Sequence, residues 1–417
     1  MSRTYRFFVE FLILVIPVIL SVTIWSDKLN SLIYTLMIID LPVIAKLVFS
    51  IFKNTKKDTN IFAVEIPTGN REFISIVRAI INLLTAVCIL AVDFQIFPRK
   101  FAKTENYGFS LMDTGVGLYV FGNAIIAPEI YKQSQLKPPL SRFKSQLVGT
   151  IPLLILGAGR FIIVKEIDYQ EHISEYGVHW NFFITLAITK LLGTTLLLVI
   201  PIKNLLLSSL LISILHEILL SYGLSSWVLS DIERNSFLTA NREGIVSILG
   251  YVALYLISVH LGEILYVKSK DIRANISCIV KLTCYALLFN ILTIIYHKHF
   301  GVSRRLANFG YLTFVLSLSV SMSVVFLIME LLLIVYTKSN NEVFNANNYI
   351  PTIFKSINYN GLLYFLIANL GTGLINLSTR TLLVPEAPSL FIIATYMFVI
   401  TGFVQVLMMN KIKLKIW

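Results

Sequence analysis

The chain has 417 residues, of which 56% are hydrophobic and 14% are charged, and its mean hydropathy is +0.77. Soluble domains usually carry about 25% charged residues, so this composition excludes an ordinary soluble protein and indicates a membrane protein. The net charge of +12 would suggest a nucleic-acid partner in a soluble chain. Here the Lys and Arg residues lie mainly in short connections between apolar runs, so we expect a lipid bilayer, no nucleic acid, and at most an anionic ligand.

Apolar runs of about 20 residues, the length needed to cross the hydrocarbon, recur from end to end. The sequence therefore predicts an all-α, polytopic transmembrane bundle that forms a single domain over residues 1–417. The predicted spans are 7–25, 30–52, 75–96, 109–129, 147–164, 181–200, 204–221, 244–265, 274–296, 306–336, 357–377 and 389–409. The run 306–336 predicts either one tilted helix or two short helices joined near Ser319 to Ser323, which gives twelve or thirteen spans.

The two ends of the chain carry possible targeting signals. The first apolar run, Phe7 to Trp25, is longer than the core of a signal peptide and no small-residue cleavage site follows it, so we expect an uncleaved anchor. Near the other end, Lys413 and Lys415 resemble the dilysine retrieval signal of endoplasmic-reticulum proteins. The counts of Lys and Arg in the connections do not decide which side of the membrane each connection faces.

Ionisable side chains inside the predicted spans are the first pointers to function. At mid-membrane such a side chain costs about 2.5 to 3.5 kcal/mol, so it needs a partner or a water-filled cavity. The candidates are Asp40, Lys46, Arg78, Asp93, Asp113, Arg160, Lys190, His216, Glu217, Glu263, Lys281 and Glu330. For any one of them taken alone, an interhelical pair or snorkelling to the interface is the simpler interpretation.

A basic connection between them distinguishes Asp93 and Asp113 from the rest of these residues. Pro98 breaks the helix after Asp93, and Arg99, Lys100 and Lys103 follow. A chain that leaves and re-enters the bilayer over so few residues is able to bring Lys103 back beside Asp93 as a carboxylate and ammonium pair. This pair would be either catalytic or a structural salt bridge that positions the connection.

The sequence lacks the common signatures of soluble hydrolases and metalloenzymes. It contains no G-x-S-x-G elbow, no H-E-x-x-H zinc pair, no Walker loop, and no His followed four residues on by Asp. Cys88, Cys278 and Cys284 lie in apolar runs at no metal spacing. We therefore expect no metal and no permanently bound cofactor. What remains is a carboxylate base beside cations that would hold phosphates or stabilise an oxyanion.

The stretch VDFQIFPRKFAKTENYGFSLMDTGVGLYVFGNAI, which contains Asp93 and Lys103, resembles the signature of the inositol acyltransferases of GPI-anchor biosynthesis, the PIG-W family, also called GPI-anchored wall transfer proteins. Three later stretches resemble the family in the same order. They are EYGVHWNFFITLA from Glu175, LTANREGIVSILGY from Leu238, and LIANLGTGLINLSTRTLL from Leu366. One departure is Lys100, where the resemblance leads us to expect a second Arg.

The resemblance implies an endoplasmic-reticulum, multi-pass enzyme with thirteen helices. Its reaction would transfer a fatty acyl group, typically palmitoyl, from acyl-CoA to the inositol ring of glucosaminyl-phosphatidylinositol. By position in the motif, the family's essential carboxylate and lysine correspond to Asp93 and Lys103. The expected co-substrate is acyl-CoA, the expected acceptor is the glycolipid, and protein partners are unknown.

Eight further residues are candidates for substrate contact. They are Arg99, Lys100, Asp113, His179, Asn181, Arg242, Asn369 and Asn376. The two basic residues would meet phosphates of CoA or of the lipid. His179 is an alternative base or a boundary histidine, and each asparagine and Arg242 would either join helices or touch hydroxyl groups. In the same region Asn241 is predicted to cap the next helix, and Gly244 to allow close packing.

Two other functional classes compete with the enzyme. Scattered intramembrane charges also line the paths of secondary transporters, although the repeated halves common in transporters are not visible in this sequence. A noncatalytic scaffold in a membrane complex is the third alternative. Formation of an acylated lipid by the purified protein is expected only of the enzyme.

Overall fold

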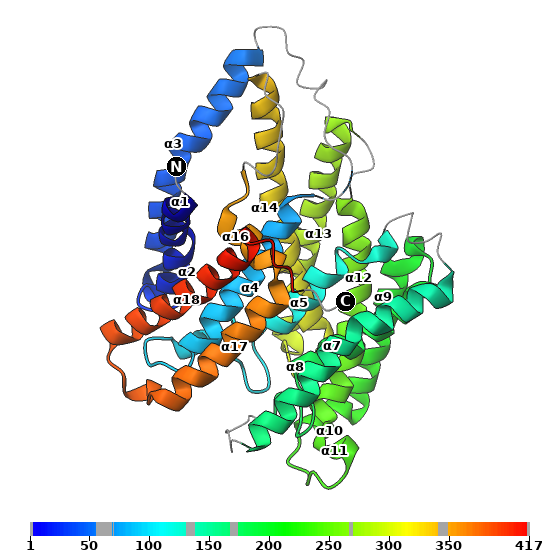
Figure 1. The fold of residues 1–417 in the computed structure, drawn as a ribbon. Coiled ribbons are helices and arrows are strands. Elements are labelled where there is room, and N and C mark those ends of the chain that lie inside the picture. The colour runs from blue at the N-terminus through cyan, green and yellow to red at the C-terminus, as the bar shows by residue number, and fades with distance from the viewer. Residues whose placement is uncertain are drawn as a thin grey trace. The chain divides into compact units, whose positions relative to one another are not determined.

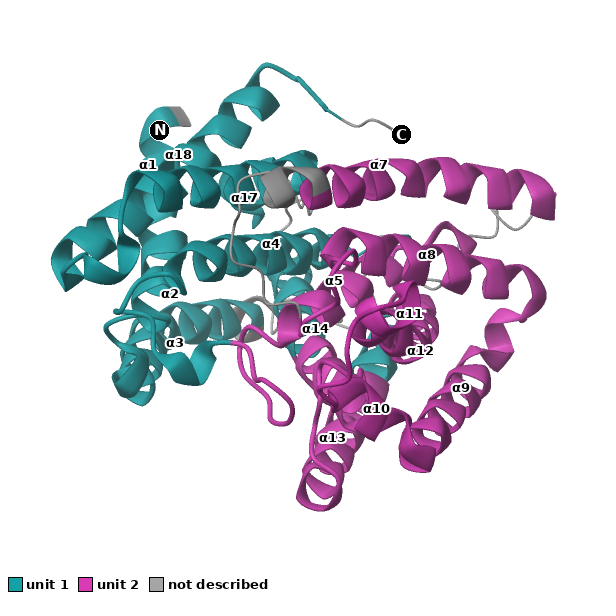
Figure 2. Ribbon diagram, turned by 90° about the horizontal axis from the view of Figure 1, so that it is seen from below, with its two compact units in different colours: residues 1–102, 267–279, 322–415 teal, residues 103–266, 280–321, 416–417 magenta. Residues whose placement is uncertain are grey.

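The computed structural model describes residues 3–55, 69, 71–130, 138–166, 174–266, 270–340 and 349–414. All regular elements in these ranges are helices (Figure 1), and ten of the described helices are long and apolar enough to cross a membrane. The prediction of an all-α, polytopic membrane protein is confirmed, whereas the count of thirteen spans is not. The chain divides into two compact units (Figure 2).

Unit 1 comprises residues 1–102, 267–279 and 322–415. Its elements are α1 (Arg3–Glu10), η1 (Phe11–Val15), α2 (Ile16–Ser21), η2 (Ser26–Lys28), α3 (Leu29–Thr55), α4 (Phe73–Ala91), η4 (Arg99–Phe101), α16 (Thr352–Tyr359), α17 (Gly361–Ser378), η8 (Thr381–Leu383) and α18 (Glu386–Met409). The helices α16, α17 and α18 all pack against α4. Because Val77, Leu83 and Leu90 of α4 are buried, this apolar helix forms the core of the unit.

Unit 2 comprises residues 103–266, 280–321 and 416–417. Its elements are α5 (Thr114–Ala124), η5 (Pro128–Ile130), α7 (Pro139–Glu166), α8 (Phe182–Val199), η6 (Ile202–Asn204), α9 (Leu205–Leu219), η7 (Leu220–Leu224), α10 (Ser225–Leu229), α11 (Phe237–Ala240) and α12 (Arg242–Leu265). The helices α5, α8 and α9 pack against α12. Most of α12 is buried, as expected of a helix that is apolar on all sides.

A glycine allows one close approach in the core of unit 2. A Cβ atom at Gly250 of α12 would lie 1.9 Å from the carbonyl oxygen of Ala307. Ala307 itself has a φ of +46°, in the left-handed region. The loop before α14 (Phe309–Ser339) therefore packs directly on the backbone of α12, a contact that only glycine permits at position 250.

The run 306–336 forms one continuous helix, α14, of 31 residues. At a rise of 1.5 Å per residue it is about 46 Å long, which exceeds the hydrocarbon thickness of about 30 Å. The alternative of two helices joined near Ser319 to Ser323 is wrong. The boundary between the two units nevertheless falls inside this helix, between Ser321 and Met322. The helix α13 (Ile272–His299) is divided in the same way, at Ile279.

Two predicted spans differ from the observed helices. The third was expected to reach residue 96, but α4 ends at Ala91 and continues as tight turns, in which Asp93 N donates to Leu90 O at 3.2 Å and Phe94 N to Ala91 O at 3.0 Å. The fourth was expected at 109–129, but α5 has only 11 residues. This length corresponds to about 16 Å, so α5 does not cross the hydrocarbon by itself.

Candidate functional site

Asp93 lies in unit 1, in the turn that follows α4. Asn376, near the end of α17, donates from Nδ2 to Asp93 Oδ2 at 2.8 Å. Burial raises the pKa of the Asp93 carboxyl above its ordinary value, while the Asn376 hydrogen bond and the charge of Arg99 act in the opposite direction. A carboxyl with a raised pKa is a stronger base than an ordinary aspartate, so this position suits proton transfer.

The amide of Asn376 joins α17 to the turn that carries Asp93, a contact that fits the first of its two predicted roles, the link between helices. Its Oδ1 atom is buried and accepts no hydrogen bond from the described residues. An unpaired buried carbonyl oxygen costs about 1–3 kcal/mol. Asp93 and Asn376 thus present oxygen acceptors next to each other, and hydroxyl groups are the natural donors to such a pair.

Arg99 and Lys100 form the exposed short helix η4 that follows Pro98. Arg99 Nη1 donates to Val92 O at 3.2 Å, so the guanidinium folds back toward the turn of Asp93. Lys100 Nζ pairs with Asp27 Oδ1 at 2.6 Å. Both side chains of this ion pair are exposed. An anionic ligand would therefore replace Asp27 as the partner of Lys100 at little cost in free energy.

Lys103 is the first residue of unit 2, since the boundary between the units falls after Ala102. Its Nζ lies 2.6 Å from Glu175 Oε1 and donates to Glu175 Oε2 at 2.9 Å. The side chains are 39% and 18% exposed. Inside unit 2, then, the lysine has a carboxylate partner that the sequence did not identify. The predicted pairing of Lys103 with Asp93 stays a prediction.

Asp113 is buried at the start of α5, where it pairs with Arg304 across 2.9 Å; the side chains are 1% and 4% exposed. Its oxygens also accept hydrogen bonds from Thr104 N at 3.2 Å, Thr104 Oγ1 at 2.9 Å and Ser110 N at 3.0 Å. The prediction placed Asp113 within a membrane span, but it closes the loop 104–113. With these protein donors in place, its contacts are those of a structural carboxylate rather than of a substrate ligand.

His179 and Asn181 lie between α7 and α8. The backbone N–H of His179 donates to Asn241 Oδ1 at 2.8 Å, and the imidazole ring lies 5.2 Å from the ring of Phe161. Asn181 caps α8, since its Oδ1 accepts from Phe183 N at 3.1 Å and its Nδ2 donates to Gly157 O at 2.8 Å. These contacts support the helix-joining interpretation of Asn181.

Asn241 occupies the N-cap position of α12, but its side chain does not cap the helix. Its Nδ2 donates to Phe237 O at 2.8 Å, and its Oδ1 is taken by His179 N. The predicted cap is therefore wrong, because the side chain instead fixes a neighbouring segment. The prediction for Gly244 is confirmed, since a Cβ there would lie 2.4 Å from the ring of Trp180.

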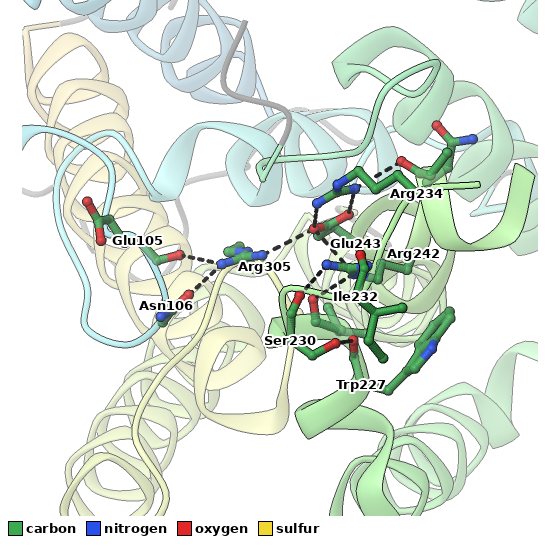
Figure 3. Close-up of polar contacts among 12 residues, drawn as sticks. Glu105, Asn106, Trp227, Ser230, Ile232, Arg234, Arg242, Glu243 and Arg305 are labelled. Atoms are coloured by element: carbon green, nitrogen blue, oxygen red, sulfur yellow. Dashed lines mark hydrogen bonds and ion pairs between the residues drawn. The ribbon is translucent and has the colours of Figure 1, made fainter. Parts of the chain in front are cut away.

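The first turn of α12 holds a buried network of charges (Figure 3). Arg242 donates to three backbone carbonyls, from Nε to Val228 O at 3.1 Å, from Nη1 to Ile232 O at 3.0 Å, and from Nη2 to Ser230 O. These are the carbonyls at and after the end of α10, and the last carbonyls of a helix have no partner within the helix. Arg242 was predicted to join helices or to touch substrate. These contacts join α12 to the end of α10.

Glu243 is fully buried in the same network, where it accepts hydrogen bonds from two arginines and its Oε1 lies 3.8 Å from Arg242 Nε. Arg234 Nη2 lies 2.6 Å from Glu243 Oε1, and Arg305 Nη2 lies 3.1 Å from the same oxygen. Arg305 also reaches Asn106 Oδ1 at 2.5 Å (Figure 3). Glu243 therefore connects α12 to the loop that begins at Lys103.

Several ionisable residues inside the spans have partners within their own unit, as expected. His216 Nε2 lies 2.8 Å from Leu306 O, and Tyr296 donates to Glu217 at 2.6 Å. Glu330 accepts from the backbone of α4 at Phe73 N, 3.1 Å away. Asn369 donates to Phe365 O within its own helix at 2.8 Å, so the structure gives this candidate no link between helices.

Sequence reasoning missed the residues that surround Lys103 and Asp113. Glu175 and Glu243 both lie inside the matching stretches, beside His179 and Arg242, which were chosen instead. Arg304 and Arg305 form a basic pair just before an apolar run, a pattern usually assigned to membrane flanks. Their position in a matching stretch was the available signal: Glu243 directly follows Arg242, and Glu175 opens the stretch that contains His179.

The described residues contain no group of three or more His, Cys, Asp or Glu side chains arranged to hold a metal ion. What they contain is a carboxyl with a raised pKa at Asp93, an ammonium at Lys103, and exposed basic residues at Arg99 and Lys100. In general, a carboxyl with a raised pKa suits a general base, and an ammonium suits the stabilisation of an oxyanion.

Known proteins resemble the chain over nearly its whole length. A family model described as GWT1 matches residues 1–407. Glucosaminyl-phosphatidylinositol-acyltransferase PIGW of Bos taurus is 33% identical over 460 residues, which cover 100% of this chain and 90% of the relative. The Homo sapiens protein of the same name is 32% identical over 457 residues, with coverage of 99% and 89%. GPI-anchored wall transfer protein 1 of Kluyveromyces lactis is 32% identical over 402 residues, with coverage of 95% and 85%.

Proposed function

The chain belongs to the GWT1 family, and from this premise we propose that it transfers a fatty acyl group, palmitoyl in the first instance, from acyl-CoA to the inositol ring of glucosaminyl-phosphatidylinositol. The coarser activity, acyl transfer in GPI-anchor biosynthesis, follows from relatives that carry it in their names and match nearly the full chain. The observation that supports the finer proposal is the partly buried Asp93 carboxyl beside the unpaired amide oxygen of Asn376.

In the proposed step, Asp93 accepts the proton of an inositol hydroxyl as that oxygen attacks the thioester carbonyl. A carbon–oxygen bond forms, the carbon–sulfur bond breaks, and the thiolate of CoA leaves and takes up a proton. Asn376 supports this step in two ways. Its Nδ2 holds the carboxylate in place, and its free Oδ1 is suited to accept a hydrogen bond from a neighbouring hydroxyl of the same ring.

Lys103 is the proposed stabiliser of the negative charge that develops on the thioester oxygen. The alternative role, as a charge partner that keeps Asp93 ionised, also follows from its place ten residues after Asp93 in the matching stretch. A positive charge at Lys103 serves either role. Arg99 and Lys100 lie exposed in the same connection and are the proposed contacts for phosphate groups of CoA or of the lipid.

The proposed place of action is the endoplasmic-reticulum membrane, where a lipid acceptor and an acyl chain are both held by the bilayer. The ten apolar helices provide the multi-pass anchoring that this location requires. Of the dilysine signal suggested by the sequence, Lys415 lies outside the described residues. No permanently bound cofactor is proposed, because acyl-CoA enters as a co-substrate.

The test uses the purified full-length chain in lipid nanodiscs. We would supply radiolabelled palmitoyl-CoA and glucosaminyl-phosphatidylinositol, and follow both the labelled glycolipid and the free thiol of CoA. The proposal predicts that both products form in equal amounts and that neither forms when either substrate is omitted. Thiol release without a labelled glycolipid would indicate a thioesterase, and the absence of both would refute the proposed activity.

A further inference from the structure

The ion pair between Lys103 and Glu175 is close, and both carboxylate oxygens lie near the ammonium. Lys103 Nζ lies 2.6 Å from Oε1 of the glutamate and 2.9 Å from Oε2. The glutamate is the more buried of the two, with 18% of its side chain exposed. A carboxylate that is this well covered restricts the lysine far more than an exposed partner would.

A further positive charge helps to hold Glu175. Arg304 attracts it electrostatically and pairs with Asp113 at 2.9 Å. Asp113 in turn accepts from the backbone and the hydroxyl of Thr104, the residue that follows Lys103 in the chain. Two direct ion pairs, Lys103 with Glu175 and Arg304 with Asp113, thus lie near each other, and the second of them is tied to the residue after Lys103.

The backbone around Glu175 is fixed by the start of α12. Gly244 N donates to Tyr176 O at 2.9 Å, and Val178 N donates to Ala240 O at 2.9 Å. Gly177 has a φ of +121°, and a Cβ there would lie 2.5 Å from Asn241 Cα. The glutamate therefore projects from a segment that has little freedom to move.

The loop after Lys103 is held by a second set of contacts. Gly108 N donates to Val302 O at 2.8 Å, and Ser303 Oγ donates to Asn106 O at 2.6 Å. Arg305 ties Asn106 to the buried Glu243 (Figure 3). The loop that follows Lys103 is therefore anchored inside unit 2 through Asn106 and Gly108. Neither residue has a role in the proposed acyl transfer.

We propose that Glu175 is a positioning residue that holds the Lys103 ammonium at a fixed point and orientation for acyl transfer. The inference rests on the proposed function, because the role of Lys103 comes from that proposal. Lys103 donates one hydrogen bond to Glu175, and an ammonium has three N–H groups, so donors remain for the substrate. Lys103 itself is 39% exposed, which leaves it accessible to that substrate.

The protonation state of Glu175 agrees with this role. Burial acts to raise the pKa of its carboxyl, but the charges of Lys103 and Arg304 outweigh burial and hold the pKa below its ordinary value. The glutamate is thus ionised at neutral pH. Its negative charge therefore attracts and orients the Lys103 ammonium.

The test compares Glu175→Gln with Glu105→Gln in the full-length protein in nanodiscs. Glu105 is an exposed residue two positions after Lys103, so it is a matched control. One readout needs no activity, namely the rate at which Lys103 is modified by a small amine-reactive reagent, measured by peptide mass spectrometry. The other is the separation of kcat from KM for the labelled donor.

For Glu175→Gln we expect Lys103 to react at least about threefold faster. We also expect kcat to fall by about 100-fold, the cost of misplacing a reacting group by about 1 Å, with KM within about threefold of wild type. Glu105→Gln should match wild type in both readouts. An unchanged labelling rate would overturn the pairing, and faster labelling with an unchanged kcat would overturn the positioning role. A wild-type protein with no acyl transfer would instead refute the proposed function and leave the labelling result standing.

If Glu175→Gln fails to fold, the charge-swapped variant Lys103→Glu/Glu175→Lys tests the positioning role of Glu175 instead. It restores the ion pair while it moves the ammonium to the other chain segment. We expect it to unfold within a few degrees of wild type but to transfer no acyl group. Recovery of activity by the swapped pair would show that only the ion pair matters and would overturn the proposal.

Discussion

Asp93 and Asp113 were both chosen from the sequence as ionisable residues within predicted spans. Replacement by Asn should lower the stability of the protein at Asp113 but not at Asp93. Asp113→Asn removes a charge that is 1% exposed and lies 2.9 Å from the guanidinium of Arg304. The neutral amide keeps the size of the side chain. Arg304 would stay buried without its closest counter-charge.

The expected cost follows from the burial of the pair. Removal of one partner of a buried ion pair destabilises a protein by about 3–5 kcal/mol. Because Glu175 still attracts Arg304 in the variant, we expect the lower end, about 3 kcal/mol. For domains of 150–250 residues this corresponds to a fall in the unfolding midpoint of about 6–12 °C.

Asp93→Asn should leave stability intact. Burial raises the pKa of the Asp93 carboxyl. A carboxyl with a raised folded-state pKa contributes stability that is present below its unfolded-state pKa and is lost as the pH rises through the folded-state value. At neutral pH the ionised Asp93 therefore costs stability, and the neutral amide should raise the midpoint slightly or leave it unchanged.

The assay is thermal unfolding of the purified proteins in one detergent, followed by intrinsic fluorescence, with Asp231→Asn as the control at an exposed loop aspartate. We expect Asp113→Asn to unfold well below the other three proteins, and Asp93→Asn to match or exceed wild type. If Asp113→Asn unfolds with wild type while Asp93→Asn unfolds at a lower temperature, the assignment of the structural and functional carboxylates is wrong.

Two further predictions concern the pH dependence and the packing of α12. The rate of acyl transfer should fall as the pH drops through the Asp93 pKa, at a pH above the ordinary aspartate value of about 3.9. In a plot of kcat/KM against pH, Asn376→Leu should shift this fall in rate to higher pH, because the variant lacks a hydrogen bond that favours the ionised form of Asp93. If the pH of the fall does not change, Asp93 is not the titrating group. Gly250→Ala should lower the unfolding midpoint through a clash with Ala307 that costs about 1–3 kcal/mol, whereas Gly115→Ala, with nothing within 4 Å of its Cβ, should not. Equal midpoints for the two variants would contradict the described packing.

The sequence was sufficient for the class of fold, because spans of about 20 apolar residues are a local property. The helices α8, α12 and α18 begin and end within a few residues of the predicted spans. The exceptions lie where polar contacts override hydropathy. Asp113 binds Thr104 and Ser110 and delays the start of α5, which shortens a predicted span to 11 residues.

The site was predictable only to the extent that its residues are close in sequence. Asp93, Arg99 and Lys103 stand in one connection and were found together. Asn376 contacts Asp93 across 283 residues, and Arg304 contacts Asp113 across 191. Such pairs are set by the packing of helices rather than by spacing along the chain. Glu175 was missed for the same reason, 72 residues from Lys103.

The central claim is that Asp93 is the base for acyl transfer to the inositol ring, and the most direct measurement is the amount of acylated glycolipid formed by Asp93→Asn in nanodiscs. Loss of a general base should lower the rate by at least about 100-fold, while Asp231→Asn retains wild-type activity. A folded Asp93→Asn protein that still forms the product at a near wild-type rate would contradict the account.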